Sequence, residues 1–467
     1  MAAIDKALIE IEGALTGGTV VTDPDILEQY SHDESEVAPC MPAAAVRATS
    51  TAEVSAVLRV SSARGIPVTP RAAGTGRVGG AVPVEGGIVL TLERMGAIKG
   101  IEPEEMLAVV EPGVVTGDLH AAAEAAGLFY PPDPNSWATC AIGGNIAANA
   151  GGPRAFKYGV TREYVLGMEV VTGDGTVLRL GRRTRKGVTG YDLTALMVGS
   201  EGTLGVVTEA TLRLVPLPEH TVTLLVMLPS EEAIERAVTS SIAHRLAPRC
   251  IELMDAETLE IIRPETALPI PPGARAMLLL ELDGDAGGID AQLETCGNAM
   301  DDAGALEVIV AKNGSERERL WASRRDLSHS LRGVAPHRMS EDVVVPRTRL
   351  AELLERTRDI AGRTGVRMPS YGHAGDGNLH INFLWNGDSD WERVERGVEG
   401  LLREVVALGG TIAGEHGVGA KKAPYLHLEQ SSELIALQRR IKAIFDPKGI
   451  LNPGKIFTGD RRFHGPC

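Results

Sequence analysis

The sequence predicts an α+β protein with two main domains, preceded by a helical segment and ending in a helical portion. Three observations predict this class. Strand and helix patterns alternate from about residue 42, three glycine-rich loops interrupt the alternation before residue 206, and a second alternation without such loops follows Pro216 and Pro218. At about 100–200 residues per domain, 467 residues give room for two to three domains.

The expected boundaries follow from these changes of pattern. We expect an N-terminal helical segment at 1–37, a first domain at 38–217, a second domain at 218–457 and a tail at 458–467. In the first domain we expect strands at 44–48, 67–69, 87–92, 107–110 and 206–214, helices at 52–64, 117–126 and 191–198, and a hairpin at 165–180. Ser50 or Thr51 caps the first helix, Gly65 ends it, and Thr116 caps the second.

The second domain reads as a sheet covered by helices. Its expected strands are 221–228, 250–254, 274–282 and 305–311, and its expected helices are 231–246, 256–262, 290–303 and 317–332. Helices at 391–408 and 432–445 make the C-terminal helical portion.

Composition and charge exclude several classes of protein. The net charge of −15 argues against nucleic acid and against an anionic membrane surface as partners, because both would repel the chain. No apolar run approaches the roughly 20 residues that span a bilayer. The start of the chain carries Asp5, Glu10 and Glu12, unlike a signal peptide. We therefore expect a cytoplasmic protein, and attachment to a membrane through a partner stays open.

The cysteines predict no thiolate chemistry. Cys40, Cys140, Cys250, Cys296 and Cys467 are scattered, odd in number and without a Cys-x-x-Cys pair. Neither an iron–sulfur cluster held by this chain nor a disulfide framework is expected, and each cysteine is interpreted as a small buried apolar residue. A redox function would then need an organic cofactor or a metal without thiolate ligands.

The glycine-rich loops predict a ligand cradle. Residues 131–159 fit neither a helix nor a strand pattern, and Gly143, Gly144, Gly151 and Gly152 suggest unpaired backbone N–H groups that suit a diphosphate. The loop at 70–80 follows a strand but precedes another strand, which argues against a Rossmann unit, and it lacks the Gly-Lys-Ser/Thr of a P-loop. A third glycine turn lies at 200–205. The three loops could converge on one elongated ligand.

A second group of candidate functional residues lies in the sequence HAGDGNLH at 373–380. If Asp376 and Gly377 form a two-residue hairpin turn, His373 pairs with His380 on one face. Two such imidazoles can share a divalent metal, zinc or manganese, with Glu415 as a third ligand beside His416. Two surface histidines near a turn are the alternative, and the Glu-His pair among glycines favours the site.

These motifs together resemble the vanillyl-alcohol-oxidase-type flavoproteins. The glycine loops, in this order, resemble their flavin-binding domain, and HAGDGNLH, GEHGVG at 414–419 and the segment 445–455 resemble their C-terminal domain. The chain is most similar to the branch of glycolate oxidase flavin subunits and bacterial D-lactate dehydrogenases, over about residues 40–457. The resemblance implies a two-part FAD-binding domain at 38–217, then an α/β substrate (cap) domain whose C-terminus returns to the flavin.

The resemblance also implies the cofactor and its contacts. Loop 70–80 would hold the FAD pyrophosphate and, having no His or Cys, would not bind flavin covalently. Glu201 and its neighbours would meet the adenosine half, and Asn452 the flavin. The implied FAD-binding residues are Arg71, Gly74, Thr75, Gly76, Gly79, Pro132, Asp133, Ser136, Thr139, Gly143, Gly144, Asn145, Gly151, Gly152, Glu201, Gly202, Gly205, Val207 and Asn452.

The implied reaction is FAD-dependent oxidation of a small D-2-hydroxy acid, D-lactate or glycolate, to the 2-keto acid by hydride transfer to flavin. Related enzymes bind a divalent metal with residues that match His373, His380 and Glu415. His416 matches their base, Asn382 a substrate-contacting asparagine, and Arg324 the arginine that binds the substrate carboxylate. The residues alone do not choose Arg324 over its basic neighbours.

Three alternatives stay open at this point: a D-2-hydroxyglutarate dehydrogenase, a non-redox transferase like alkyl-glycerone-phosphate synthase, and a silent flavin subunit of a larger complex. No lysine stands near 339–342 to bind a second carboxylate, which favours a monoacid. The electron acceptor could be a quinone, a cytochrome, an electron-transferring flavoprotein or an iron–sulfur subunit. A homodimer and a heteromeric complex are both allowed.

Overall fold

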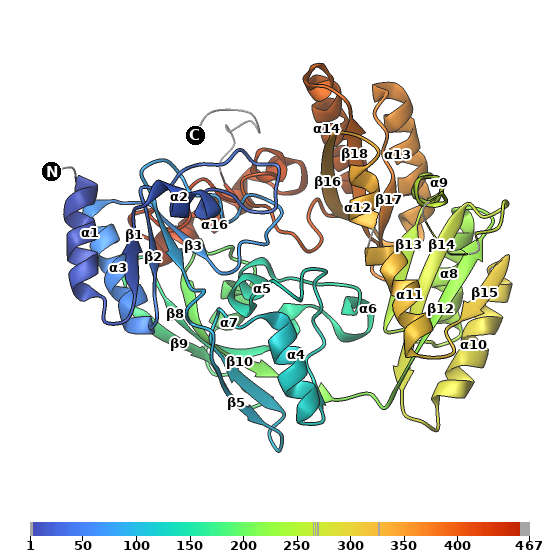
Figure 1. Ribbon diagram of the computed structural model, residues 1–467, viewed down its shortest axis with the longest axis horizontal. Helices are drawn as coiled ribbons and strands as arrows, with labels where there is room; N and C mark the ends of the chain where they lie inside the picture. The colour runs from blue at the N-terminus through green and yellow to red at the C-terminus, as the bar shows by residue number, and fades with distance from the viewer. Residues whose placement is uncertain (1–2, 265, 267, 269, 326, 458–467) are drawn as a thin grey trace. The chain divides into compact units, whose positions relative to one another are not determined.

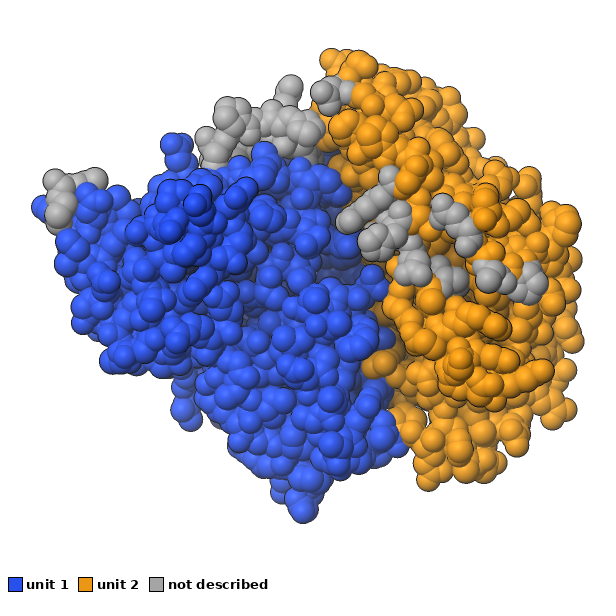
Figure 2. Space-filling model, in the orientation of Figure 1, with its two compact units in different colours: residues 1–151, 160–217, 415–467 blue, residues 152–159, 218–414 orange. Residues whose placement is uncertain are grey.

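The computed structural model describes residues 3–264, 266, 268, 270–325 and 327–457, so the expected tail at 458–467 lies outside the described residues. The chain forms two compact units: unit 1 comprises 1–151, 160–217 and 415–467, and unit 2 comprises 152–159 and 218–414 (Figure 2). The chain passes from unit 1 to unit 2 after Leu217, and both 152–159 in unit 2 and 415–457 in unit 1 are separated in sequence from the rest of their unit.

Unit 1 contains three sheets and the helices that cover them (Figure 1). Its strands are β1 (Thr19–Val21), β2 (Ala44–Arg47), β3 (Val68–Arg71), β4 (Ile88–Thr91), β5 (Ile98–Glu102), β6 (Leu107–Val110), β7 (Leu128–Phe129), β8 (Val165–Val171), β9 (Val177–Gly181), β10 (Val206–Arg213) and β11 (Val215–Pro216). Its helices are α1 (Ala3–Ala14), α2 (Pro24–Leu27), α3 (Thr51–Arg64), α4 (Thr116–Ala125), α5 (Ile142–Ala148), α7 (Leu193–Met197), α15 (Leu426–Glu429) and α16 (Ser432–Phe445).

The sheets of unit 1 have the orders β1-β2-β4-β3, β5-β6-β10-β8-β9 and β11-β7. Strands β2, β4 and β3 run parallel, as expected for two strands joined through the helix α3, whereas the five-stranded sheet is antiparallel. Ser50 caps α3 by accepting the N–H of Glu53, and Gly65 ends it at φ +67°. The sequence predicted this helix and its caps.

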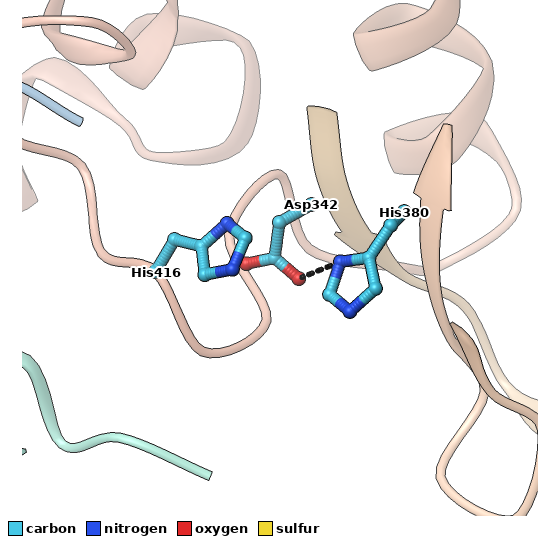
Figure 3. Close-up of side chains that lie close together, drawn as sticks. All are labelled: Asp342, His380 and His416. Carbon is cyan, nitrogen blue, oxygen red and sulfur yellow. Dashed lines mark ion pairs between the residues drawn. The ribbon is translucent and has the colours of Figure 1, made fainter. Parts of the chain in front are cut away.

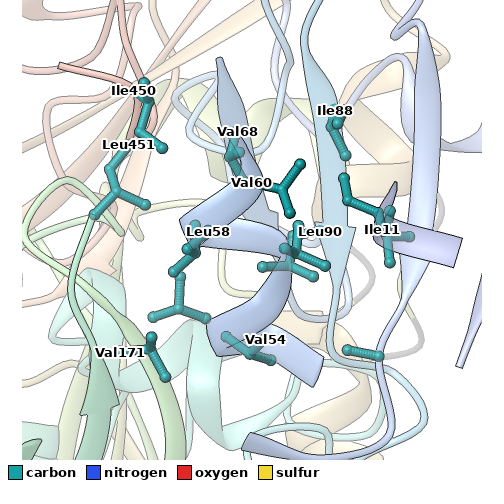
Figure 4. Close-up of a cluster of buried hydrophobic side chains, with 14 of the residues drawn as sticks. Ile11, Val54, Leu58, Val60, Val68, Ile88, Leu90, Val171, Ile450 and Leu451 are labelled. Carbon is teal, nitrogen blue, oxygen red and sulfur yellow. The ribbon is translucent and has the colours of Figure 1, made fainter. Parts of the chain in front are cut away.

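The core of unit 1 joins segments from both ends of the chain. Ile11 of α1, Leu58 of α3 and Leu90 of β4 pack in one buried cluster with Ile450 and Leu451 (Figure 4). The N–H of Val68 donates to the carbonyl of Ile450, and the N–H of Asn452 donates to the carbonyl of Val68, each at 2.8 Å. The C-terminal segment is thereby fixed beside β3.

Unit 2 is built on one seven-stranded sheet of order β15-β12-β14-β13-β17-β18-β16, in which every pairing is antiparallel. Its strands are β12 (His220–Leu228), β13 (Cys250–Met254), β14 (Ala276–Gly284), β15 (Glu307–Val310), β16 (His337–Val344), β17 (Ser370–His373) and β18 (Asn378–Trp385). Its helices are α6 (Ala155–Tyr158), α8 (Glu232–Ala243), α9 (Ala256–Ile262), α10 (Ile289–Asp302), α11 (Gly314–Arg325), α12 (Leu327–Arg332), α13 (Leu350–Thr364) and α14 (Trp391–Ala407).

Helices cover the strands β12 and β14 of this sheet, which are apolar and buried along most of their length. Helix α10 packs against β12 and β14, α14 packs against β16, and α8 contacts both α10 and α13. Helices α9, α11 and α12 pack around a second cluster that includes Leu225, Met277 and Leu320. None of the described helices in either unit has the length and hydropathy to cross a bilayer.

The predicted fold class is confirmed, but several local expectations were wrong. The stretch 131–159 contains a helix, α5, that includes Gly143 and Gly144. Helix α4 begins at Thr116 and its N-cap residue is Val115. Thr116 instead accepts a hydrogen bond from Asn145 Nδ2 at 2.7 Å, which ties α4 to α5.

Two further local expectations can be compared with the structure. The helix expected at 317–332 corresponds to α11 and α12, with residue 326 between them outside the described residues. Cys40 is buried as expected but is also disulfide-bonded, whereas Cys140, Cys250 and Cys296 are buried and form no disulfide.

Candidate functional site

Unit 1 contains a cavity of about 410 Å³ whose walls come from the three glycine-rich loops. Many of the residues expected to bind FAD line it. These are Arg71, Gly74, Thr75, Gly76, Ser136, Thr139, Gly143, Gly144, Asn145, Gly151, Glu201, Gly202, Gly205 and Val207. Gly79, Pro132, Asp133 and Asn452 are not among its lining residues, and Gly152 belongs to unit 2.

The loop after β3 has the backbone of an anion site. Gly74 adopts φ +74° and Gly79 φ +73°, a conformation that favours glycine. From Ala73 to Gly80, no backbone N–H donates a hydrogen bond to another described residue. A run of free N–H groups in such a loop beside a cavity suits a phosphate or diphosphate.

The N-terminus of α5 does not provide such groups. The N–H of Gly143 donates to Pro112 at 2.8 Å, and those of Gly144 and Asn145 donate to Ala141 at 3.0 and 3.1 Å. A Cβ on Gly143 would lie 2.6 Å from Pro112 Cβ, so close packing explains this glycine. The expectation of unpaired N–H groups is wrong for these residues.

Asn452 contributes an unpaired acceptor near the loops that line the cavity. Its Nδ2 donates to the carbonyls of Gly80 at 2.9 Å and Glu201 at 2.8 Å. Its Oδ1 is buried and has no hydrogen-bond partner among the described residues. A buried acceptor without a partner is costly, and a ligand N–H would remove that cost. The free N–H groups of 73–80 and this acceptor fit a cofactor with a diphosphate and a polar ring.

Glu201 and Arg71 have protein partners of their own. The Glu201 carboxylate accepts the N–H groups of Val418 at 2.8 Å and Gly419 at 2.7 Å, which fixes the loop that follows His416. Burial raises the pKa of Glu201 above its usual range, because its effect is larger than the lowering by these two donors. Arg71 donates to the carbonyls of His32 and Gln29 at 2.7 and 3.1 Å.

In unit 2 the two expected histidines lie together. The rings of His373 and His380 are 5.3 Å apart between centroids and nearly perpendicular. The predicted register was wrong, however, because His373 pairs with Asn378 and Tyr371 pairs with His380. The turn therefore has four residues instead of two. The register moved by two residues, which keeps both imidazoles on the same face since side chains alternate with a period of two.

Glu252 connects this pair to Arg324. Its Oε2 accepts from Arg324 Nε at 2.8 Å, and its Oε1 lies 2.5 Å from His373 Nδ1. Burial raises the Glu252 pKa, but His373 and Arg324 outweigh burial and hold the pKa below its usual range. The Arg324 guanidinium also lies over the Tyr371 ring, 4.7 Å from its centroid. Sequence reasoning missed Glu252, although it is the one charged residue in the apolar strand Cys250–Met254.

Asp342 is the second residue that sequence reasoning did not assign to the site. It is buried, its Oδ1 lies 3.8 Å from His380 Nδ1, and this ion pair is drawn in Figure 3. Its Oδ1 also accepts from Asn378 Nδ2 at 2.6 Å, and its Oδ2 accepts from the N–H of Gly414 at 2.8 Å. Asp342 lies on β16 directly opposite His380 of β18, and this register has no local signal in the sequence.

Asn382 is also engaged within unit 2. Its Nδ2 donates to the carbonyls of Pro369 at 3.2 Å and His380 at 3.0 Å, and its Oδ1 accepts from Arg338 at 3.1 Å. The amide thus organises the backbone beside His380. Glu415 and His416 belong to unit 1, where both line the cavity.

Family models match most of the chain. A family described as "FAD binding domain" matches residues 42–181, and one described as "FAD linked oxidases, C-terminal domain" matches residues 217–456. The chain belongs to the FAD-linked oxidase family. The resemblance to vanillyl-alcohol-oxidase-type flavoproteins is confirmed, and the first domain of this family member is a FAD-binding domain.

Relatives are similar over nearly the whole chain. Identity is 42% with the glycolate oxidase subunit GlcD of Bacillus subtilis, covering 93% of each chain, and 37% with the D-lactate dehydrogenase of Anaerostipes hadrus, covering 94% of each. It is 33% with the D-2-hydroxyglutarate dehydrogenase of Stutzerimonas stutzeri, covering 97% of this chain and 99% of that one. The solved structure of p-cresol methylhydroxylase has the same fold, with a TM-score of 0.81, 18% identity and coverage of 97% and 96%.

Proposed function

We propose that this chain oxidises a small D-2-hydroxy acid, D-lactate or glycolate, to the 2-keto acid with non-covalent FAD and a divalent metal. The observation that carries the proposal is the cluster in unit 2, where His373 and the buried Arg324 share the Glu252 carboxylate and the His380 ring lies beside that of His373. The substrates in the relatives' names share a carboxylate next to a hydroxyl-bearing carbon. An arginine suits the carboxylate, and imidazoles that bind a metal suit the neighbouring hydroxyl group.

The residues of unit 1 fit FAD. The free N–H groups of 73–80 would hold its diphosphate, and Asn452 Oδ1 would accept from a ring N–H. Bound FAD supplies the acceptor for the two electrons that leave the substrate. Glu201 would keep the loop that carries His416 in place through Val418 and Gly419.

The donor set of unit 2 fits a divalent metal. The Nδ1 of His373 is engaged by Glu252, which leaves Nε2 as the metal-binding atom, an arrangement common for metal-ligating histidines. His373 and His380 would supply imidazole ligands to the ion, which would polarise the substrate hydroxyl; zinc and manganese both accept such ligands.

The remaining steps belong to side chains of this chain. Arg324 would bind the substrate carboxylate through Nη1 and Nη2, because its Nε is used by Glu252. His416 would accept the hydroxyl proton at an imidazole nitrogen, a task suited to a group that titrates near neutral pH. The proton leaves to solvent after the keto acid departs.

The first test is anaerobic mixing of the FAD-loaded protein with D-lactate, L-lactate, glycolate and D-2-hydroxyglutarate, with and without a chelator. We expect D-lactate or glycolate to bleach the flavin, and chelation to abolish bleaching until metal is restored. Bleaching by D-2-hydroxyglutarate alone would favour the second candidate, which the relative from Stutzerimonas stutzeri supports. Absence of bleaching by all four would contradict the proposal and favour a transferase or a silent subunit.

The role of His416 is tested by His416→Ala. We expect FAD content to be unchanged and flavin reduction by the best acid to slow by about 10²–10⁴, the usual contribution of a general base. His427→Ala is the matched control, because His427 is an exposed histidine whose Nδ1–H donates to the Pro424 carbonyl at 2.9 Å. Reduction at the wild-type rate in His416→Ala would remove His416 from this role.

A further inference from the structure

Strand β13 contains a charge where an apolar residue would be expected. Its residues Cys250, Ile251, Leu253 and Met254 are buried, and Glu252 among them is 1% exposed. A buried carboxylate costs several kcal/mol unless charged partners and hydrogen bonds compensate it. The position therefore needs an explanation beyond packing of the sheet.

The two oxygens of Glu252 are divided between two different elements. Oε2 accepts from Arg324 on α11, and Oε1 is bonded to His373 at the end of β17. Arg324 is itself buried, with 7% of its surface exposed, and stacks on Tyr371. One carboxylate thus fixes the plane of a guanidinium and the rotation of an imidazole.

The bond to His373 also selects a tautomer. Because the carboxylate accepts at Nδ1, the neutral imidazole carries its proton there and presents the Nε2 lone pair. The bond to Arg324 uses the single Nε–H, and neither Nη group donates a hydrogen bond to Glu252 among the described residues. Each partner is thereby presented in the form that its proposed ligand requires.

We infer that Glu252 is a positioning residue that prepares His373 for a metal and Arg324 for a carboxylate at the same time. The inference rests on the proposed function. It goes further by making the two binding events dependent on one side chain that contacts neither ligand.

The matched set of variants is Glu252→Gln, Glu252→Asp and Asp283→Asn. Gln removes the charge at nearly constant size, and Asp keeps the charge on a side chain one methylene shorter. Asp283 is a comparable control because it is 1% exposed, lies on the neighbouring strand β14 and is charge-paired with Lys157 and Arg249. It touches neither His373 nor Arg324 in the described part of the chain.

Two affinities are measured on the FAD-loaded protein after chelation: Mn²⁺ by calorimetry, and pyruvate by the change in flavin absorbance. We expect Glu252→Gln to weaken Mn²⁺ binding by about 10–100-fold, the usual effect of losing a carboxylate behind a metal-binding histidine. We expect pyruvate binding to weaken by about 10-fold, with FAD content unchanged. Glu252→Asp, which can reach only one partner, is expected to lose one affinity and keep the other, and Asp283→Asn to keep both.

Each result is decisive. Wild-type affinities in Glu252→Gln, or equal losses in Asp283→Asn, would overturn the role of Glu252 and leave the proposed function standing. If the wild type binds neither Mn²⁺ nor pyruvate, the proposed function fails and the inference falls with it. If Glu252→Gln does not yield folded, FAD-containing protein, Glu252→Asp decides: loss of one affinity alone supports the role, and loss of neither or of both overturns it.

Discussion

At the residue scale, buried carboxylates do much of the organising in both units. Glu53 is 1% exposed and accepts N–H groups from two chain segments: Oε1 from Thr16, Gly17 and Gly18 at 2.7–3.0 Å, and Oε2 from Thr49 at 2.8 Å. Burial by itself raises its pKa, but these donors outweigh burial, and the pKa lies well below the usual range. The side chain therefore anchors the N-terminal segment to α3 as an anion.

Glu53→Gln is expected to destabilise unit 1 in a pH-dependent way. At pH 7 the loss should be roughly 1.5–3 kcal/mol, the range for one hydrogen bond to a charged group, because an amide can accept with one atom only. A depressed pKa gives stability that is present above the unfolded value near 4.5 and is lost as pH falls toward the folded value. The difference between wild type and variant should therefore shrink from pH 6 to pH 3.

Urea unfolding followed by circular dichroism at several pH values measures this difference. Glu10→Gln is the control, since Glu10 pairs with Arg64 at the surface and should contribute little. A difference between wild type and Glu53→Gln that stays constant with pH would contradict the assignment.

At the element scale, the turn between β17 and β18 contains Gly377 in a backbone conformation that favours glycine. Gly377 adopts φ +77°, and a Cβ at this position would collide with the carbonyl oxygen of Val345. The N–H of Val345 also donates a hydrogen bond to the carbonyl of Gly377, which holds the two residues close together. Gly409, after α14, has nearly the same φ of +78°, but a Cβ there would meet nothing within 4 Å. An alanine at either position would therefore suffer the same backbone strain, but only an alanine at Gly377 would also collide with a neighbouring atom.

We expect Gly409→Ala to cost about 1–2 kcal/mol, the strain of a left-handed residue, and to leave flavin reduction unchanged. Gly377→Ala should cost a further 1–3 kcal/mol or so for the collision, and should slow flavin reduction because the turn beside His373 must shift. FAD content should be normal in both, since the cavity lies within unit 1. Equal effects of the two substitutions on melting and on reduction would refute this account of the turn.

At the scale of the whole molecule, the residues that line the cavity all belong to one compact unit. Binding at 100 times the dissociation constant stabilises a folded unit by about 2.7 kcal/mol. We expect FAD added to the apoprotein to slow hydrogen exchange of the N–H groups at 73–80, and to leave exchange in β12 and β14 unchanged. Riboflavin, which lacks the diphosphate, should not protect 73–80. Protection by riboflavin equal to that by FAD would place the diphosphate elsewhere.

Much of the fold could be predicted because its signals are local. The caps and period of α3, the apolar strand β13 and the limits of α16 were all predicted within a residue. The stretch 131–159 misled because its glycines imitate a loop, while α5 is held by packing of Gly143 on Pro112, which no local pattern encodes. The histidine pair was predicted on the right face with the wrong register, since turn length was inferred from Asp376-Gly377 alone.

By itself, the sequence determined the family, the three glycine loops and the residue types available for chemistry, because motif order and periodicity are properties of neighbouring residues. Only the tertiary structure decided which groups meet. It paired Glu252 with Arg324, which is 72 residues away in the sequence, and with His373, which is 121 residues away. It also placed Asn452 against the carbonyls of Gly80 and Glu201. Such contacts arise from burial and sheet register, which bring distant segments together without leaving a local signature.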